Sequence, residues 1–414
     1  MMADEKVDIL VAGAGAAGLS AAIALAQAGF SVACAGQIDR RANGRTVALF
    51  ESSLRFYKAL GLWPRLRDLA APLAKIAMVD ATNARFAAPS VTFAASEIGL
   101  AAFGANIENN VLVEELAQAA RAALSLRECL IADIRFEPGG VDATLADGSR
   151  IRAALVVAAD GRQSLVRSRA AIEARSWTYP QIAATALLAH EKPHRDISTE
   201  FHTRSGPCTL VPLRPRDGLA HRSSLVWLMS DAEAERRRAL NDEALAGEIE
   251  DQVGGLLGAM ALDGACGFFP MAGMSVSRLT GERVALVGEA AHLFPPLAAQ
   301  GLNLSLRDVA ALVQTVEDAR SRGEDFGTLE ALEPYAAARR GDISLRTNGV
   351  DLLNRSLLSE FAPVDLMRSA GFFAFAAIGP LRRALMREGV LTHGDLPRLM
   401  QPPPRRKTPS RAHA

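Results

Sequence analysis

One glycine-rich run, Gly13-Ala14-Gly15-Ala16-Ala17-Gly18, restricts what this chain can fold into more than any other segment. It follows an apolar run from Val7 to Ala12 and opens an alanine- and leucine-rich stretch, Ala17 to Gln27, that stops before Gly29. This order predicts a buried strand, a tight turn and a helix. With a second strand expected over Phe30 to Ala35, the segment forms a βαβ unit.

The residues of this turn have separate physical roles. The first glycine permits the tight turn, the second lets the backbone approach a pyrophosphate, and the third lets the helix pack closely on the strand. The N–H groups and the positive dipole end of the helix then face the phosphates. The run therefore predicts a dinucleotide site made of Gly13, Gly15, Ala16, Ala17 and Gly18.

One expected element of such a site is missing. An acidic residue at the end of the second strand usually binds the adenosine ribose. Here the strand ends in Ala35-Gly36-Gln37, and the first acid is Asp39. Gln37 or Asp39 replaces it, or the ribose is held from elsewhere. The absence of this acid weakens an NAD interpretation more than an FAD interpretation, because an FAD fold has two further segments that hold its cofactor.

Both further segments are present, each after a buried strand, where α/β folds bind ligands. Asp160-Gly161 follows Leu155 to Ala159, and Gly288-Glu289 follows Arg283 to Val287. Pro295 and the run Gly301-Leu302-Asn303 come next, before a helix expected near Leu302 to Ala319. Backbone N–H groups at the start of that helix would stabilise the negative charge of a reduced flavin. The three segments together predict FAD.

Composition narrows the remaining possibilities. The chain has 414 residues, 49% of them apolar, and no formal net charge, which is typical of a multidomain globular protein. It has no basic field for nucleic acid. Its four cysteines are widely spaced and form no disulfide or metal-ligand pattern. The acidic start and the lack of a ~20-residue apolar run predict a cytoplasmic protein.

The predicted fold class is α/β, with a discontinuous Rossmann-like FAD/NAD(P)-binding domain, an inserted mixed-sheet substrate domain and a C-terminal helical segment. The FAD-binding domain is expected over 1–74, 103–175 and 270–345. The substrate domain is expected over 75–102 and 176–269, where prolines, histidines and short β-like runs dominate. A helical region, 346–400, and a disordered tail, 401–414, complete the chain.

Beyond the three nucleotide segments, the chain resembles the class A flavin monooxygenases of the p-hydroxybenzoate hydroxylase type. It is most similar to the ubiquinone-biosynthesis hydroxylases, over roughly residues 5 to 390. The runs that carry the resemblance are Arg45-Thr46, Leu60-Gly61-Leu62-Trp63-Pro64, Asn106-Ile107, His190-Glu191, Glu200-Phe201, Gly206-Pro207, Arg222 to Trp227 and Gln300 to Asp308. The middle-domain runs are the more specific ones, because generic FAD proteins lack them.

The resemblance implies two-electron reduction of FAD, its reaction with molecular oxygen to a C4a-hydroperoxide, and hydroxylation of a polyprenylated phenol in ubiquinone biosynthesis. It places Asp160 and Gly161 near the pyrophosphate and Arg45 near the cofactor. It places Glu289 on the ribityl hydroxyls. It also implies that Pro295, Gly301, Leu302 and Asn303 lie beside the flavin ring. No acid–base residue stands out, which fits chemistry carried by the cofactor.

Two positions depart from the family pattern. Glu289 stands where the family usually has aspartate, so its carboxylate must sit differently. Asn110 stands where arginine is common, which removes one cationic contact, so Asn110 is given no role. The electron donor stays open between NAD(P)H and a reduced ferredoxin.

Other polar and apolar clusters have plainer interpretations. His190, His194 and His202 have spacings that suit no standard metal site, and structural hydrogen bonds are expected instead. His292 either positions the cofactor or packs. The apolar run from Ser369 to Leu381 has arginines on both sides and is too short to span a bilayer. It would contact a membrane surface, a quinone-biosynthesis complex or a second subunit of a homodimer, or pack on the core.

Two alternatives to a hydroxylase stay open. One is another FAD-dependent oxidoreductase or dehydrogenase, although a disulfide reductase would need a reactive cysteine pair and Cys34 is alone. The other is a non-catalytic component of a quinone-biosynthesis complex. The missing ribose acid and the change to Glu289 keep that second alternative open.

Overall fold

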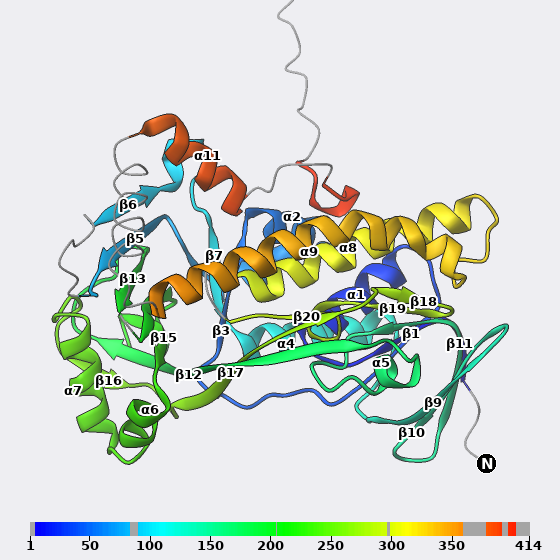
Figure 1. The fold of residues 1–414 in the computed structure, drawn as a ribbon, viewed down its shortest axis with the longest axis horizontal. Coiled ribbons are helices and arrows are strands. Elements are labelled where there is room, and N and C mark those ends of the chain that lie inside the picture. Colours follow the sequence, from blue (N-terminus) through cyan, green and yellow to red (C-terminus); the bar gives the residue numbers. More distant parts are fainter. Residues whose placement is uncertain are drawn as a thin grey trace, which may run out of the picture.

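In the computed structural model, residues 5–82, 90–203, 205–295, 299–358, 378–390 and 396–402 are described. They form two large sheets and one small one, with the long helices of residues 300–358 along the upper side of the molecule in the view of Figure 1.

The first sheet is built around the N-terminal strand. Its path is β18-β19-β11-β1-β2-β8, and the strands from β19 to β8 run parallel. A hairpin, β9 and β10, pairs antiparallel with β11. The strands are β1 (Glu5–Ala12), β2 (Val32–Ala35), β8 (Ser125–Arg127), β9 (Ile131–Glu137), β10 (Gly140–Leu145), β11 (Arg150–Ala158), β18 (Thr280–Gly281) and β19 (Val284–Leu286).

Apolar runs explain why this sheet lies at the centre of the main core. Ile9, Leu10 and Val11 on β1, like Leu155 to Ala158 on β11, are fully buried, as parallel strands covered on both faces require. The helices α1 (Ala16–Gln27), α4 (Asn109–Ala123) and α8 (Gln300–Ser321) pack against one another and contribute to the same cluster. The carboxyl ends of β1, β11 and β19 therefore meet at one edge.

The second sheet is mixed and forms the other end of the molecule. Its path is β20-β17-β12-β15-β14-β13-β5-β6, with β16 beside β12, and only β13 and β5 pair parallel. The strands are β5 (Lys75–Asp80), β6 (Val91–Ala94), β12 (Ala174–His190), β13 (Ile197–Thr203), β14 (Gly206–Leu213), β15 (Arg222–Met229), β16 (Met260–Leu262), β17 (Gly267–Val276) and β20 (His292–Leu293). The long strands β12 and β17 connect the two ends of the molecule (Figure 1).

Smaller elements join the two sheets. Strands β3 (Thr46–Phe50), β4 (Ala71–Pro72) and β7 (Gly104–Glu108) form a three-stranded sheet. The helices in these connections and on the second sheet are α2 (Glu51–Ala59), α3 (Trp63–Arg67), η1 (Ala95–Ile98), α5 (Leu165–Arg169), α6 (Asp231–Arg238), α7 (Asp242–Gln252) and η2 (Gly288–Ala290). Residues of α6 and α7 cover one face of the second sheet, where they bury Trp227 and its neighbours.

The C-terminal part is helical. Helix α9 (Leu329–Leu358) runs alongside α8, α11 (Gly379–Val390) covers β6 and η1, and η4 (Arg398–Met400) contacts α2 and α8 (Figure 1). Among the described residues, no helix is long and apolar enough to cross a membrane. The apolar run 369–377 and the tail 403–414 lie outside the described residues.

The structure has the expected α/β architecture, and the differences are local. The second strand begins at Val32 rather than at Phe30, because the Phe30 ring packs instead on Phe326 at 5.1 Å and under Arg320. The strand expected over 155–159 begins earlier, at Arg150, because its first half pairs with the hairpin. The two helices α6 and α7 were not expected. The domain boundaries given above stay predictions.

Candidate cofactor site

The glycine turn between β1 and α1 has the predicted close contacts. Gly13 has a φ of +107°, and a Cβ there would lie 2.3 Å from the carbonyl oxygen of Ala159. A Cβ at Gly18 would lie 1.9 Å from the carbonyl oxygen of Gly13. A Cβ at Gly15, in contrast, would meet nothing within 4 Å. The first and third glycines are thus required by the protein's own packing, and the second leaves space outside the protein.

The start of helix α1 presents unused hydrogen-bonding capacity to that space. Its N-cap residue is Gly15, with no side-chain cap, and no acidic residue stands in the first turn. The N–H groups at the start of a helix need acceptors, and the positive end of the helix dipole favours an anion. Ala16 and Ala17 therefore lie where the phosphate of a dinucleotide would be held.

The Asp160-Gly161 segment lies next to this turn. Asp160 Oδ2 accepts a hydrogen bond from the Val166 N–H at 3.2 Å, while Oδ1 is buried and has no partner among the described residues. Gly161 has a φ of +81°, and a Cβ there would meet nothing within 4 Å. A buried acceptor without a partner is costly. A cofactor hydroxyl or an ordered water would satisfy it.

The Gly288-Glu289 segment follows β19, at the carboxyl edge of the first sheet. Gly288 has a φ of +59°, and a Cβ there would lie 3.0 Å from Ser305 Oγ. Glu289 is exposed. Arg167 joins this segment to the previous one, because its guanidinium donates to the carbonyls of Ala290 at 2.9 Å and Arg162 at 2.8 Å. Sequence reasoning missed Arg167, which lies in the middle of the short helix α5 after Asp160.

The side chain of Asn303 is fully engaged within the protein, and the expected place of this residue beside the flavin ring stays a prediction. Its side-chain amide is buried, accepts from the Phe50 N–H and Ser53 Oγ, and donates to the carbonyls of Ala48 and Ala299. The side chain therefore fastens the start of α8 to β3 and α2.

The neighbouring residues leave the start of α8 open. Gly301 is exposed, and a Cβ there would meet nothing within 4 Å, while Leu302 is half-buried and Pro295 is buried. Ala299, the N-cap residue, has a left-handed φ of +50° and no side-chain cap. A second helix N-terminus without a side-chain cap thus lies between Gly288 and Asn303, and its contact with the flavin ring stays a prediction.

A buried carboxylate holds the first end of this loop. Asp308 Oδ2 accepts from the Gly288 N–H at 3.1 Å and from His292 Nε2 at 2.6 Å, and its Oδ1 accepts from Arg339 Nε at 2.8 Å. Burial would raise the pKa of Asp308, but the charges of His292 and Arg339 and these hydrogen bonds outweigh it and lower the pKa. His292 therefore positions the loop through Asp308.

Helix α9 holds the second end. Asp342 binds three arginines, with Arg339 at 2.7 Å, Arg307 at 3.0 Å and Arg346 at 2.7 Å. Arg346 Nη1 also donates to Gln300 Oε1 at 2.9 Å, at the first residue of α8. We call Arg307, Asp308, Arg339, Asp342 and Arg346 the α8–α9 charge network. Sequence reasoning missed its roles, although charged residues on the apolar face of a helix were a signal that could have been followed.

The end of β2 clarifies the missing ribose acid. The carboxylate of Asp39 accepts from Arg41 Nε at 2.8 Å and Nη2 at 3.0 Å, and these hydrogen bonds lower its pKa. Gln37 is exposed just beyond β2. Because Asp39 is already engaged, we propose that Gln37 binds the adenosine ribose.

This assignment gives a first prediction. Gln37→Ala is expected to weaken FAD binding by roughly 3- to 10-fold, the value of one neutral hydrogen bond. Asp39→Ala is the matched control and should leave the affinity unchanged. Titration of the apoprotein, followed by quenching of flavin fluorescence, measures both. Equal losses in the two variants would contradict the assignment.

Arg45 lies at the junction of the two sheets. Its guanidinium stacks over the Phe269 ring at 5.6 Å, and its carbonyl accepts from the Asn109 N–H at 3.0 Å. Gly44 before it has a φ of +74°, and a Cβ there would lie 2.7 Å from the carbonyl oxygen of Thr185 on β12. Its place near the cofactor stays a prediction.

His190, His194 and Cys34 have structural surroundings in the described part of the chain. His190 uses both ring nitrogens, toward the Lys192 carbonyl at 2.8 Å and Ser223 Oγ at 2.9 Å, and burial lowers its pKa. His194 Nε2 lies 3.2 Å from the Leu213 carbonyl oxygen. Burial raises the pKa of the Cys34 thiol to about 12, which makes it a poor nucleophile. A disulfide-reductase chemistry at the first motif therefore has no support.

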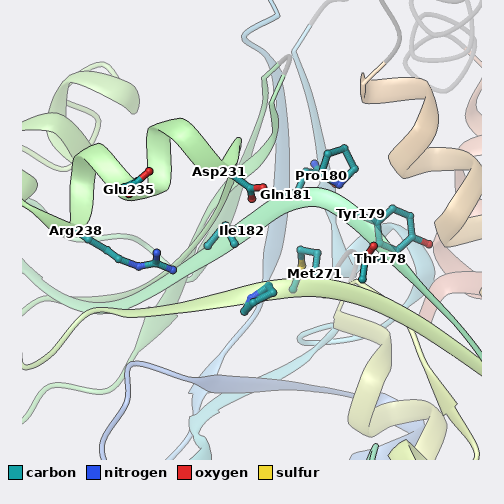
Figure 2. Close-up of a pocket in the computed structure, with 10 residues that line it drawn as sticks. Thr178, Tyr179, Pro180, Gln181, Ile182, Asp231, Glu235, Arg238 and Met271 are labelled. Carbon is teal, nitrogen blue, oxygen red and sulfur yellow. The ribbon is translucent and has the colours of Figure 1, made fainter.

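A separate cavity of about 730 Å³ lies between β12, β17 and α6 (Figure 2). It is lined by Thr178, Tyr179, Pro180, Gln181, Ile182, Asp231, Glu235, Arg238, Pro270 and Met271. No residue predicted to bind the cofactor is among them. Met271 connects it to the apolar cluster of Phe294 and Leu304, which backs the loop before Pro295. Its charged wall on α6 suits a polar ligand better than an isoprenoid chain.

Comparison with known proteins now decides the family. A family model described as an FAD binding domain matches residues 6–336, which include all three predicted nucleotide segments. The chain belongs to this FAD-binding family. The α8–α9 charge network lies partly beyond the match, because Arg339, Asp342 and Arg346 follow residue 336.

Relatives of this FAD-binding protein extend over nearly its whole length. It is 35% identical over 411 residues to the ubiquinone hydroxylase UbiL of Rhodospirillum rubrum, covering 96% of this chain and 94% of that one. It is 30% identical to the 3-demethoxyubiquinol 3-hydroxylase of Escherichia coli, covering 93% and 99%. The p-nitrophenol 4-monooxygenase of Pseudomonas putida shares the fold, with a TM-score of 0.77 at 17% identity over 93% and 98% of the two chains.

The residues present fit FAD. Gly15, Gly161 and the buried Asp160 Oδ1 follow the adjacent parallel strands β1 and β11, and the starts of α1 and α8 have no side-chain cap. We propose that Gly13 to Gly18 and Asp160-Gly161 hold the pyrophosphate, and that Glu289 holds the ribityl hydroxyls. Pro295, Gly301, Leu302 and Asn303 would then lie beside the flavin ring.

Proposed function

We propose that this protein is an FAD-dependent monooxygenase that hydroxylates the aromatic ring of a polyprenylated phenol in ubiquinone biosynthesis. The observation that carries the proposal is the near full-length similarity to two ubiquinone-pathway hydroxylases of different bacteria. The fit of the three nucleotide segments to FAD supports it. When bound, FAD supplies the two-electron chemistry and the activation of oxygen, which no amino-acid side chain can provide.

The overall reaction requires one ring C–H bond, one O₂ molecule and two electrons with two protons. One oxygen atom enters the ring as a hydroxyl, and the other leaves as water. NAD(P)H or a reduced ferredoxin is the proposed class of electron donor. The chain itself has to position the ring, exclude water and stabilise negative charge on the cofactor.

Named residues would perform these tasks. The uncapped start of α8, at Ala299 to Gly301, offers backbone N–H groups to the flavin pyrimidine ring. Asn303 and the α8–α9 charge network fix that start and the Gly288 end of the loop. The apolar cluster of Ala183, Leu228, Met271, Phe294 and Leu304 would keep the space beside the loop dry.

The proposed substrate has a long apolar tail, so we also propose that the protein meets it at the surface of the inner membrane or within a quinone-biosynthesis complex. The charged cavity of Figure 2 is a poor candidate for the tail. The segment after Gly288 and the apolar cluster at β20 are the better candidate for the binding site of the substrate's aromatic ring, because they lie beside the proposed flavin position.

A deletion strain tests the function. We expect loss of ubiquinone and accumulation of a prenylated intermediate that lacks one ring oxygen, identified by mass spectrometry of the quinone fraction. The wild-type gene should restore ubiquinone, and a Gly15→Ala gene, which should bind FAD poorly, should not. Normal ubiquinone in the deletion strain would contradict the proposal. Purified protein that neither holds nor takes up FAD would instead favour a non-catalytic role.

A further inference from the structure

A second cavity, of about 660 Å³, lies between the long strands β12 and β17 and helix α9. Its lining includes Ala291, which belongs to the segment between Gly288 and Asn303 that we call the flavin loop, but none of the residues assigned above to FAD. We call it the α9 pocket. Neither the proposed hydroxylation nor the cofactor uses it.

The floor of the α9 pocket contains an aromatic ring held in one orientation. A Cβ at Gly273 would lie 2.2 Å from Cε2 of Trp177, and 2.4 Å from Cζ2 and from Nε1. The indole face therefore covers Gly273, and only glycine leaves room for it. The indole Nε1 donates to the Tyr179 hydroxyl at 2.7 Å, and that hydroxyl donates to Asp351 at 2.7 Å. The ring is thus fixed between the strands and α9.

The charges around this ring favour an anion. Arg175, Arg278 and Arg340 line the pocket with Glu333 and Asp351, so three cations face two acids. Arg340 lies 3.5 Å from Glu333 and is neutralised by it. Arg175 and Arg278 make no ion pair or hydrogen bond through their guanidinium groups within the part of the chain that the structure describes. Both arginines are exposed, and they line the strand side of the pocket without a carboxylate partner among the described residues.

A buried hydroxyl on the opposite wall also has no partner. Thr347 on α9 is 9% exposed, and its Oγ1 has no hydrogen bond among the described residues. Burying a hydroxyl without a hydrogen bond costs free energy that an acceptor atom of a ligand would recover. Hydroxyls of Ser275 and Thr280 also line the pocket.

From these features we infer that the α9 pocket is a ligand site for a small organic anion that carries a flat, unsaturated ring. The ring stacks on Trp177, the anionic group lies between Arg175 and Arg278, and an acceptor atom takes the hydrogen of Thr347 Oγ1. Because Ala291 lies on the pocket wall, the bound anion lies next to the flavin loop.

Two probes that differ in charge test the chemistry of the site. The anionic probe is 8-anilinonaphthalene-1-sulfonate, and the neutral one is N-phenyl-1-naphthylamine, which has the same rings without the sulfonate. Calorimetric titration of the FAD-loaded protein should show the anion binding at least about 10-fold more tightly, the scale of a charge-assisted hydrogen bond. Equal affinities for the two probes would overturn the inference.

Variants locate the binding. Arg175→Gln and Arg278→Gln are each expected to lower the affinity for the anionic probe by about 5- to 10-fold. The FAD content and the hydroxylation rate should stay unchanged. Arg150→Gln, an exposed arginine on the first sheet, is the matched control and should bind as the wild type does. Unchanged affinity in both pocket variants would place the probe elsewhere and overturn the proposal.

A third variant separates ligand binding from a structural role. Thr347→Val keeps the shape of the side chain and removes only the partnerless hydroxyl, so the protein should unfold at the same or a higher denaturant concentration. The affinity for the anionic probe should nevertheless fall by about 3-fold or more. If the affinity does not change, Thr347 does not face the ligand and the inference fails.

Discussion

Replacing Asp308 by asparagine is expected to lower the free energy of unfolding by roughly 3 kcal/mol and to weaken FAD binding. Asp308 is fully buried, and its carboxylate accepts hydrogen bonds from the Gly288 N–H, His292 and Arg339. Asparagine keeps the shape but removes the charge, so Arg339 loses one of its two carboxylates inside the protein. The Gly288 end of the flavin loop loses its anchor at the same time.

The pH dependence of stability checks the cause of this loss. The pKa of Asp308 is lowered in the folded protein, so its ionised form stabilises the fold above the unfolded-state pKa of about 3.9. That stabilisation is lost as the pH falls through the lower folded-state value. Urea unfolding at several pH values should therefore show a wild-type advantage over Asp308→Asn that is full near pH 7 and shrinks below about pH 4.

Asp318 on the same helix provides the control. Its carboxylate is 41% exposed and pairs with Arg398 at 2.8 Å, so Asp318→Asn should cost no more than about 1 kcal/mol and leave FAD binding unchanged. If Asp308→Asn proved as mild as Asp318→Asn, the α8–α9 charge network would not support the flavin loop.

The features that sequence analysis predicted well are local ones. The glycine turn, the strand before it and the helix after it all depend on neighbours within about thirty residues. Helix α1 accordingly begins one residue from the expected position, at Ala16. The hairpin of β9 and β10 was also expected, because Gly139-Gly140 and alternating apolar residues fix it within one short segment.

One missed element had a signal in the sequence. Ser230 and Glu233 form a capping box at the start of α6, with Ser230 Oγ accepting from the Glu233 N–H at 3.3 Å. Such a serine with glutamate three residues later marks a helix start. The following residues are almost all charged and lack an apolar face of helical period, so a search by hydrophobic periodicity alone passes over them.

The charge network and Asn303 could not be predicted from local patterns. Asn303 joins α8 to residues about 250 positions earlier, and Asp308 meets Arg339 only because α8 and α9 pack side by side. Those contacts depend on tertiary structure, and a single sequence contains no record of them. Gln37 and Asp39 were both candidates in the sequence, and the contact of Asp39 with Arg41, two residues further on, favours Gln37.

The second large effect is expected from Gly15→Ala, which tests the cofactor site without disturbing the fold. Gly15 has a φ of −80° and a ψ of 178°, which alanine adopts without strain, and its Cβ would meet no protein atom within 4 Å. The apoprotein should be as stable as the wild type or gain up to about 1 kcal/mol. The new methyl group would occupy the space of the pyrophosphate, so FAD affinity should fall by about 10- to 100-fold.

Two other glycines show why unchanged apoprotein stability together with weaker FAD binding points to a ligand-binding position. Gly18→Ala should destabilise even the apoprotein, because its Cβ would lie 1.9 Å from the Gly13 carbonyl oxygen. Gly247→Ala, in helix α7 and facing open space, should gain roughly 0.5–1 kcal/mol and bind FAD normally. Thermal unfolding of the apoproteins and FAD titrations separate the three cases. A Gly15→Ala protein that binds FAD as tightly as the wild type would mean that the pyrophosphate lies elsewhere, since nothing but a ligand competes for that space.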